Sequence, residues 1–288
     1  MSTDVGLSGA LTGKARVAGV LGWPVGHSRS PRLHGHWLRR YGIDGAYVPL
    51  PVRAEAFPRA LRALADLGFA GCNVTVPHKE AALATCDAVS HTARAIGAVN
   101  TVVIRDGHLF GDNSDAFGFI ENLRQEAPDW RPAAGPAVVL GAGGAARAVI
   151  HALLEAGVPA LRLVNRTLDR AEQLGRELDR DGRLTVADWS QRARLLGDAG
   201  LLVNTTALGM AGQPPLDLAL ERLPPAALVT DIVYSPLETD LLARARTRGN
   251  PVVDGLGMLL HQARLGFRQG FGVEPVVDAA LRRAVLED

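Results

Sequence analysis

Short apolar runs alternate with amphipathic, helix-spaced segments along almost the whole chain. Such runs are typical of buried strands, and spacings of three and four residues are typical of helices packed on them. In the first half the pattern predicts strands at Arg16–Leu21, Ala46–Pro51, Gly71–Val76 and Val99–Arg105, and helices at Ser30–Tyr41, Ala54–Leu67 and Pro77–Thr85. We expect Ser30 at the N-cap of its helix and Pro31 at the first helical position. Asp106 and Gly107 predict a hairpin turn into His108–Gly111.

The second half restarts the alternation. It predicts strands at Ala137–Leu140, Leu161–Val164, Leu201–Asn204, Leu228–Ile232 and Pro251–Val253, and helices at Gly144–Glu155, Asp169–Leu178, Leu237–Arg248, Leu256–Gly270 and Pro275–Leu286. Alternation of this kind predicts an α/β fold with a parallel sheet covered on both faces. The Pro-, Gly- and Asp-rich stretch Ala127–Pro136 predicts a domain boundary near the middle of the chain.

Composition narrows the class of protein. A length of 288 residues fits two domains or one large one, and a net charge of +1 gives no electrostatic case for nucleic acid or an anionic membrane. Cys72 and Cys86 have neither metal-site spacing nor a disulfide framework, which fits a reducing compartment. Residues 1–16 lack a signal-peptide core and are expected to form a loose extension, and no run approaches transmembrane length. We therefore expect a cytoplasmic protein. The oligomeric state stays open, a homodimer included.

Only two of the 31 basic residues are lysine, Lys14 and Lys79. Arginine stays protonated throughout the useful pH range, whereas its surroundings can tune a lysine ammonium to lose its proton. A chain this rich in arginine could use it wherever only positive charge is needed, so Lys79 is a candidate for proton transfer. The alternative is a leftover surface lysine, the interpretation that fits Lys14.

A strand, a glycine turn and a helix start follow one another at Val138–Ala148. The segment fits G-x-G-x-x-A, in which Gly141 would permit the tight turn and Gly143 would let backbone approach a pyrophosphate. Ala146 would keep the helix close to the sheet. Plain packing also produces small residues at such turns, but the flanking strand and helix favour a dinucleotide site.

The end of the next strand indicates which dinucleotide is bound. An NAD site usually has an acidic residue there for the ribose 2′-hydroxyl, and this chain has none. Arg166 instead offers a guanidinium fork for a 2′-phosphate, flanked by the neutral groups of Asn165 and Thr167. An exposed arginine that merely starts a helix is the alternative. Together these features favour NADP.

Polar residues gather at four strand–helix junctions of the first half. They are Ser28 and Ser30, then Asn73, Thr75 and Lys79, then Asn100, and finally Asp112 and Asp115. Each has a local explanation, such as helix capping by Ser30 or Asp115 and a strand-end turn at Asn100. Four such junctions before a nucleotide-binding half favour a substrate site.

With these motifs in place, the sequence resembles the shikimate dehydrogenase family over nearly its whole length. The matching phrases are Gly22–His34, Gly71–Lys79, Gly97–Thr101, Gly111–Gly118, Gly141–Ala148, Asn165–Thr167, Asn204–Met210, Asp231–Pro236 and Asp254–Ala263. The resemblance implies reversible NADP-linked oxidation of shikimate to 3-dehydroshikimate, on the route to chorismate and the aromatic amino acids. It also implies a substrate domain of residues 1–115 and 256–288, and a Rossmann-like doubly wound parallel domain of residues 116–255.

The resemblance assigns roles to residues. Lys79 and Asp115 would form the catalytic acid–base pair. Substrate would be bound by Ser28, Ser30, Thr75, Asn100, Asp115, Tyr234 and Gln262. NADP would be bound by Gly141, Ala142, Gly143, Gly144, Ala145, Asn165, Arg166, Thr167, Ile232 and Gly255. The chain departs from the family pattern at Gly35, which follows His34 in place of the usual asparagine, and at His91, where an acid is common.

The proton chemistry also follows from the residue types. Hydride transfer from a secondary alcohol requires the hydroxyl proton to leave, and the reverse reaction requires a donor to the developing alkoxide. A lysine ammonium, with a reference pKa of about 10.4, is a suitable donor that a carboxylate can hold in place. No histidine pair has metal-ligand spacing, so no metal is expected, although His78 could line the pocket. A quinate/shikimate or aminoshikimate dehydrogenase and a non-catalytic shikimate sensor remain alternatives; retention of both Lys79 and Asp115 argues against the sensor.

Overall fold

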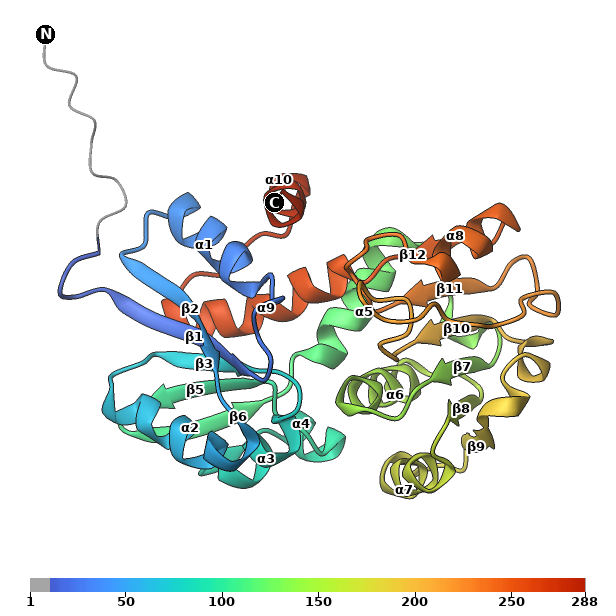
Figure 1. Ribbon diagram of the computed structural model, residues 1–288, viewed down its shortest axis with the longest axis horizontal. Helices are drawn as coiled ribbons and strands as arrows, with labels where there is room; N and C mark the ends of the chain where they lie inside the picture. Colours follow the sequence, from blue (N-terminus) through green and yellow to red (C-terminus); the bar gives the residue numbers. More distant parts are fainter. Residues whose placement is uncertain (1–10, 288) are drawn as a thin grey trace, which may run out of the picture. The chain divides into compact units, whose positions relative to one another are not determined.

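The computed structural model describes residues 11–287, shown in Figure 1. The expectation of a loose N-terminal extension falls mostly on residues 1–10 and therefore lies outside the described residues. The chain divides into two compact units. The first takes its described residues from 1–90, 99–112 and 263–288, and the second comprises 91–98 and 113–262.

The first unit is built on a six-stranded sheet of order β2-β1-β3-β5-β6-β4. Its strands are β1 (Arg16–Gly22), β2 (Gly45–Pro51), β3 (Gly71–Val74), β4 (Ala88–Val89), β5 (Thr101–Arg105) and β6 (His108–Asp112). Its helices are α1 (Ser30–Arg40), α2 (Phe57–Asp66), α3 (Lys79–Thr85), α10 (Ala279–Leu286) and the later part of α9 (Leu256–Phe271).

This sheet is mixed, whereas strand–helix alternation predicted parallel strands. β1 pairs in parallel with β2 and β3, but β5 is antiparallel to both β3 and β6. The reversal comes from the predicted hairpin: Asp106 and Gly107 have φ values of 50° and 74°, the left-handed backbone that a two-residue hairpin turn requires. A hairpin joins neighbouring strands without a crossover helix, so those strands must be antiparallel.

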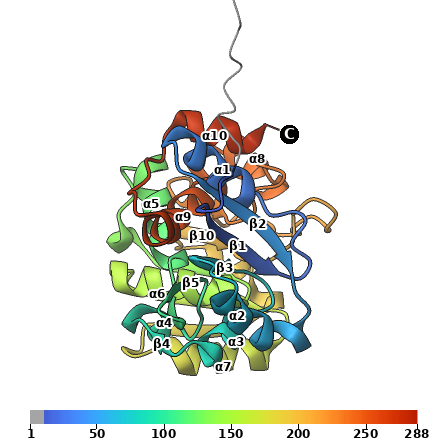
Figure 2. The ribbon, with the colours of Figure 1, turned by 90° about the vertical axis from the view of Figure 1, so that its left-hand side faces the viewer.

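Helices cover both faces of the first sheet. Figures 1 and 2 show α1 and α10 on one side and α2 with α3 on the other. This follows from handedness, because the β1–β2 and β2–β3 crossovers run in opposite directions along the sheet and right-handed connections then place their helices on opposite faces.

The start of α1 differs from the prediction. The helix begins at Ser30, with Arg29 at the N-cap and no side-chain cap, so Ser30 is not the capping residue. Instead, the Ser30 backbone N–H donates to Oγ of Ser28, at 3.3 Å. The departure at Gly35 is accommodated, because a Cβ there would meet only an Arg39 guanidinium nitrogen, at 3.5 Å.

The second unit has a wholly parallel sheet of order β12-β11-β10-β7-β8-β9. Its strands are β7 (Ala137–Leu140), β8 (Leu161–Asn165), β9 (Leu184–Asp188), β10 (Leu201–Asn204), β11 (Leu228–Asp231) and β12 (Val252–Val253). Its helices are α4 (His91–Ile96), α5 (Asp115–Glu126), α6 (Gly144–Ala156), α7 (Leu168–Leu178), α8 (Asp240–Thr247) and the first part of α9. The strand order is that of a dinucleotide-binding fold, which reverses between β7 and β10.

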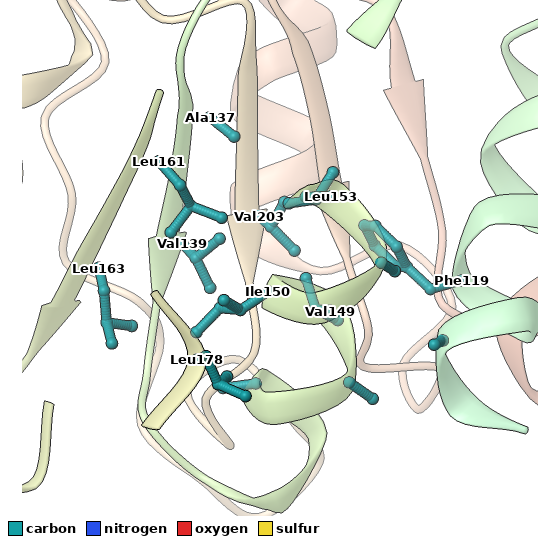
Figure 3. Packing of buried hydrophobic residues seen from close by; sticks show 14 of the residues in the cluster. Phe119, Ala137, Val139, Val149, Ile150, Leu153, Leu161, Leu163, Leu178 and Val203 are labelled. Atoms are coloured by element: carbon teal, nitrogen blue, oxygen red, sulfur yellow. The ribbon is translucent and has the colours of Figure 1, made fainter. Parts of the chain in front are cut away.

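Alternate residues of β7 enter two different cores. Ala137 and Val139 belong to a cluster with α6 and α7, whereas Val138 and Leu140 belong to one with α8. Figure 3 shows Ile150 and Val149 of α6 against Val139 and its neighbours from β8 and β10. The predicted sheet covered on both faces is therefore confirmed for this unit.

Among the α-helices and strands of the described residues, β4, α4, α5 and β9 were not expected from the sequence. Other predicted elements are present with shifted ends; the helix expected from Pro77, for example, begins at Lys79.

Candidate functional site

The predicted substrate residues of the first unit lie along one edge of its sheet. Ser28 and Ser30 follow β1, while Thr75 and Lys79 follow β3, which pairs beside β1 in parallel. Asn100 directly precedes β5, which runs antiparallel to β3 and therefore starts at the same edge. β2 and β3 lie on opposite sides of β1, so the connections that leave the ends of β1 and β2 run in opposite directions. Such a reversal of strand order is a topological switch point, and α/β sheets bind ligands at the carboxyl ends of the strands there.

Backbone hydrogen bonds fix these segments against one another. The Thr75 N–H donates to Leu21 O at 2.9 Å, and the Val74 N–H donates to Asn100 O at 2.8 Å. The Val99 N–H donates to Lys79 O at 2.9 Å, which ties the first turn of α3 to the segment that carries Asn100. The backbone of Lys79 is thus fixed at the same sheet edge as Thr75 and Asn100.

Gly22, the last residue of β1, makes room for Thr75. A Cβ at Gly22 would lie 2.5 Å from the Thr75 methyl group and 3.4 Å from Val76 O. Any larger residue would push Thr75 away from the sheet edge.

In the second unit the glycine turn follows β7, as predicted. Gly141 has a φ of +103°, and a Cβ there would lie 2.9 Å from Oγ1 of Thr205. Gly143 is the N-cap of α6 and provides no side-chain cap, and an added Cβ would meet nothing within 4 Å. Ala146 is completely buried against the sheet. First-turn amides beside open space, at the positive end of a helix dipole, fit the pyrophosphate of a dinucleotide.

The neighbouring strands hold this turn in place. The Gly141 N–H donates to Val164 O of β8 at 2.8 Å, and Thr205, after β10, donates through its N–H and hydroxyl to Leu140 O. Asn165 ends β8 and donates through Nδ2 to Thr167 O at 2.8 Å. Arg166 is exposed between them, so its guanidinium can meet a phosphate in solvent-facing space.

Ile232 and Gly255 come together beyond the ends of β11 and β12. Gly255 is buried with its Cα against the Ile232 carbonyl, and a Cβ at Gly255 would clash with that group. Tyr234 lies two residues further along the Ile232 segment and is partly buried. The structure therefore places these three predicted residues at the same edge of the second sheet as the glycine turn.

Asp115 and Gln262 belong to the second unit. Asp115 is the first residue of α5, with Ser114 at the N-cap, and its N–H donates to Oδ1 of Asn113 at 3.0 Å. Gln262 lies on α9 where α9 crosses α5, because a Cβ at Gly118 would lie 2.8 Å from Cβ of Gln262. Gly118 thus allows the close approach that sets the backbone position of Gln262.

A buried polar network, whose members had no role assigned from the sequence, joins the ends of β10 and β11. Asn204 donates through Nδ2 to both carboxylate oxygens of Asp231, each at 3.1 Å, and accepts at Oδ1 from the N–H and hydroxyl of Thr206. Asp231 also accepts from the Val233 N–H at 3.0 Å and the Thr239 hydroxyl at 2.8 Å. The network fixes the loops after both strands. A polar residue ending an apolar strand is the sequence signal that could have revealed it.

Burial gives Asp231 a measurable pH signature. Desolvation raises its pKa from 3.8 to about 6, despite the hydrogen bonds that favour the carboxylate. The folded state then binds a proton that the unfolded chain releases between about pH 4 and 6, so stability falls as the pH rises through this window. We expect the unfolding free energy of wild type, relative to Asp231→Asn, to increase by about 2 kcal/mol from pH 7.5 to 4.5.

Chemical denaturation of both proteins across this pH range would measure the difference. Surface carboxyls in ion pairs also make stability depend on pH, as Asp198 does because Arg162 lowers its pKa. Both proteins contain these groups, so their contribution cancels when the two unfolding free energies are subtracted. A difference that does not change with pH would show that Asp231 is charged throughout.

Cys72 and His78 are buried inside the first unit, and Cys86 is partly buried there. Burial raises the pKa of Cys86 to about 11 and that of Cys72 further, so neither is a thiolate at neutral pH. His78 is buried, stacked on Phe57 at 4.4 Å, with Nε2 2.7 Å from Val52 O. These contacts pack His78 inside the unit, and the suggestion that it could line the pocket stays a prediction. Within residues 11–287, no group of His, Cys, Asp and Glu could hold a metal ion.

Comparison with known proteins identifies the family. The shikimate dehydrogenase substrate binding domain matches residues 20–102, and the shikimate / quinate 5-dehydrogenase domain matches residues 127–208. A shikimate dehydrogenase (NADP(+)) of Rhodospirillum rubrum is 68% identical over 96% of this chain and 99% of its own length. The chain belongs to the shikimate dehydrogenase family. A second such relative, from Paramagnetospirillum magneticum, is 61% identical over 96% of this chain and all of its own.

Solved structures of the family share the fold. Shikimate 5-dehydrogenase from Thermus thermophilus, in complex with NADP(H) and shikimate, has a TM-score of 0.83 at 40% identity, covering 94% of this chain and 98% of its own. Quinate dehydrogenase from Corynebacterium glutamicum, in complex with NAD, has a TM-score of 0.88 at 33% identity, covering 94% and 99%. The predicted α/β fold and the predicted family are thus confirmed, and the protein is an oxidoreductase.

The site residues predicted for this shikimate dehydrogenase form two sets, one in each compact unit. Ser28, Ser30, Thr75, Lys79 and Asn100 share the sheet edge of the first unit. The second set, from the second unit, comprises Asp115, Tyr234 and Gln262 with the glycine turn, Asn165–Thr167, Ile232 and Gly255. His91, where the family often has an acid, is the exposed first residue of α4.

Proposed function

We propose that this protein catalyses the reversible NADP-dependent oxidation of shikimate to 3-dehydroshikimate. The observation that carries the proposal is the sheet edge of the first unit, where Lys79 lies on backbone held against Asn100 and Thr75. Hydroxyl, amide and ammonium groups together suit a small polyhydroxylated acid. The near full-length identity to shikimate dehydrogenases supports the same conclusion.

Lys79 is the proposed acid–base residue. In the oxidative direction its amine accepts the proton of the reacting hydroxyl as the carbon loses hydride, and in the reductive direction its ammonium returns that proton to the alkoxide. NADP+, when bound, supplies the hydride acceptor. Asp115 is proposed to orient the lysine and exchange protons with it. The chain connects Asp115 to this edge through Asp112, whose carbonyl accepts from the Asn100 N–H at 3.0 Å.

The remaining predicted residues bind and orient. Ser28, Ser30, Thr75, Asn100, Tyr234 and Gln262 are proposed to hold the carboxylate and hydroxyls of the substrate. The open N-terminus of α6 would hold the pyrophosphate, and Arg166 would hold the 2′-phosphate that distinguishes NADP from NAD. Residues 1–115 with 256–288 and residues 116–255 remain our proposed substrate and cofactor domains.

The context of the reaction is also part of the proposal. The product would serve chorismate and aromatic amino acid biosynthesis, and the protein would act in the cytoplasm without nucleic acid or membrane partners. Residues 11–287 contain no helix of sufficient length and apolarity to span a membrane.

An assay of NADP reduction by purified protein with shikimate tests the function. We expect kcat/KM to be highest with shikimate and NADP, and at least about tenfold lower when quinate or NAD is substituted. Preference for quinate with NAD would identify a quinate dehydrogenase. A folded preparation that binds shikimate by calorimetry but never turns it over would indicate a sensor.

A further inference from the structure

Four polar side chains form a hydrogen-bonded row behind the sheet edge of the first unit. The Tyr47 hydroxyl lies 2.7 Å from Oδ1 of Asn73, and Nδ2 of Asn73 lies 3.2 Å from both Asn100 O and Oγ1 of Thr101. The Thr101 hydroxyl lies 2.9 Å from Oδ1 of Asn100. The row therefore ends on the side chain of a proposed substrate residue.

One backbone carbonyl sets the direction of the bonds that Asn73 makes. Asn100 O can only accept, so the Asn73 group facing it must be the amino group, and Oδ1 of Asn73 must face Tyr47. Tyr47 is then the donor to Asn73, and Thr101 receives a hydrogen from Asn73. Thr101 donates its own hydrogen to Asn100, whose facing atom is the amide oxygen Oδ1.

Burial makes this arrangement costly to reverse. Thr101 is 1% exposed and Asn100 3% exposed, and Tyr47 is stacked on His34 with ring centroids 3.9 Å apart. Burial also raises the pKa of Tyr47, so its hydroxyl stays protonated as the donor at the start of the row. A flipped amide at Asn100 would replace the oxygen that accepts from the Thr101 hydroxyl by an N–H, and the hydroxyl hydrogen would lose that acceptor in a buried place.

We propose that Thr101 and Asn73 are positioning residues that lock the amide of Asn100, so that its amino group is directed away from Thr101 and toward substrate. Asn100 then acts as a hydrogen-bond donor to an oxygen of the substrate, in one preset orientation. This inference rests on the proposed function, which makes Asn100 a substrate-binding residue. Without the Thr101 hydroxyl the amide can rotate, and part of the bound population presents an acceptor where the substrate needs a donor.

Thr101→Val removes the hydroxyl and keeps the β-branched shape that a strand favours. We expect kcat/KM for shikimate to fall about five- to tenfold, the effect of one hydrogen bond, while KM for NADP changes less than about twofold. Thr101→Ser, which restores the hydroxyl, should recover most of the activity. Thr230→Val is the matched control, because Thr230 is equally buried in β11 and its Oγ1 has no hydrogen-bond partner among the described residues.

A double-mutant cycle separates positioning from general damage. In an Asn100→Ala background, Thr101→Val should cause no further loss in kcat/KM, because there is no amide left to orient. An equal loss in both backgrounds, an equal loss in Thr230→Val, or wild-type kinetics in Thr101→Val would overturn the inference. Absence of shikimate turnover by wild type would refute the proposed function instead, so the two failures are distinguishable.

Discussion

Replacing Lys79 by methionine is expected to lower kcat for shikimate oxidation by about 10³-fold, the middle of the range for a positioned proton-transfer group. Methionine keeps the length of the side chain but can neither accept nor donate the proton of the reacting hydroxyl. Lys79→Arg should lose nearly as much, because guanidinium retains its proton throughout the useful pH range. Initial rates of NADP reduction at saturating shikimate would measure both.

The chain provides a matched control in its only other lysine. Lys14 is exposed, and Lys14→Met should leave kcat within about twofold of wild type. Calorimetry should show that Lys79→Met still binds shikimate, since hydroxyl and amide groups along the same edge remain. Near-normal kcat in Lys79→Arg would contradict the proton-transfer role and leave Lys79 as a positive charge that any basic residue could supply.

Local patterns predicted those elements whose signal lies within their own residues. The β5–β6 hairpin follows from Asp106 and Gly107, which tolerate positive φ, and the turn after β7 follows from Gly141. The candidate site residues were predicted from their positions at the ends of strands. Because the ends of neighbouring strands meet at one edge of a sheet, polar residues at these positions are expected to lie together. Lys79, Thr75 and Asn100 are examples.

Elements that depend on tertiary contacts could not be predicted in this way. α5 was missed because Gly118 weakens its helical pattern, and that glycine is needed only because α9 passes within 2.7 Å of a Cβ placed there. The mixed first sheet depends on which strands pair, and strand pairing leaves little trace in a single strand. The Tyr47–Asn73–Thr101 row and the Asn204–Asp231 network are likewise products of side chains brought together from separate strands.

Replacing Arg166 by alanine is expected to raise KM for NADP about 50- to 100-fold, with kcat changed less than about threefold. The guanidinium is exposed after β8, and within the described residues it has no acidic partner, so its fork is available to a 2′-phosphate. Charge-assisted hydrogen bonds contribute about 1.5–3 kcal/mol, or roughly 10- to 150-fold, and a two-pronged contact places the expected change in the upper part of that range. Because NAD lacks the phosphate, kcat/KM for NAD should be unchanged. Cofactor titrations at fixed shikimate would give both constants.

Two further variants separate recognition of the phosphate from general electrostatics. Arg166→Lys keeps the charge but loses the two-pronged geometry, so its KM for NADP should fall between wild type and alanine. Arg176, exposed in the last turn of α7 and 3.8 Å from Glu172, is the control for removal of one positive charge, and Arg176→Ala should leave both cofactors unaffected. Equal losses with NADP and NAD in Arg166→Ala would mean that this side chain supports the loop around Asn165 rather than reading the phosphate. Discrimination would then have to come from the neutral groups of Asn165 and Thr167 or from the missing acid alone.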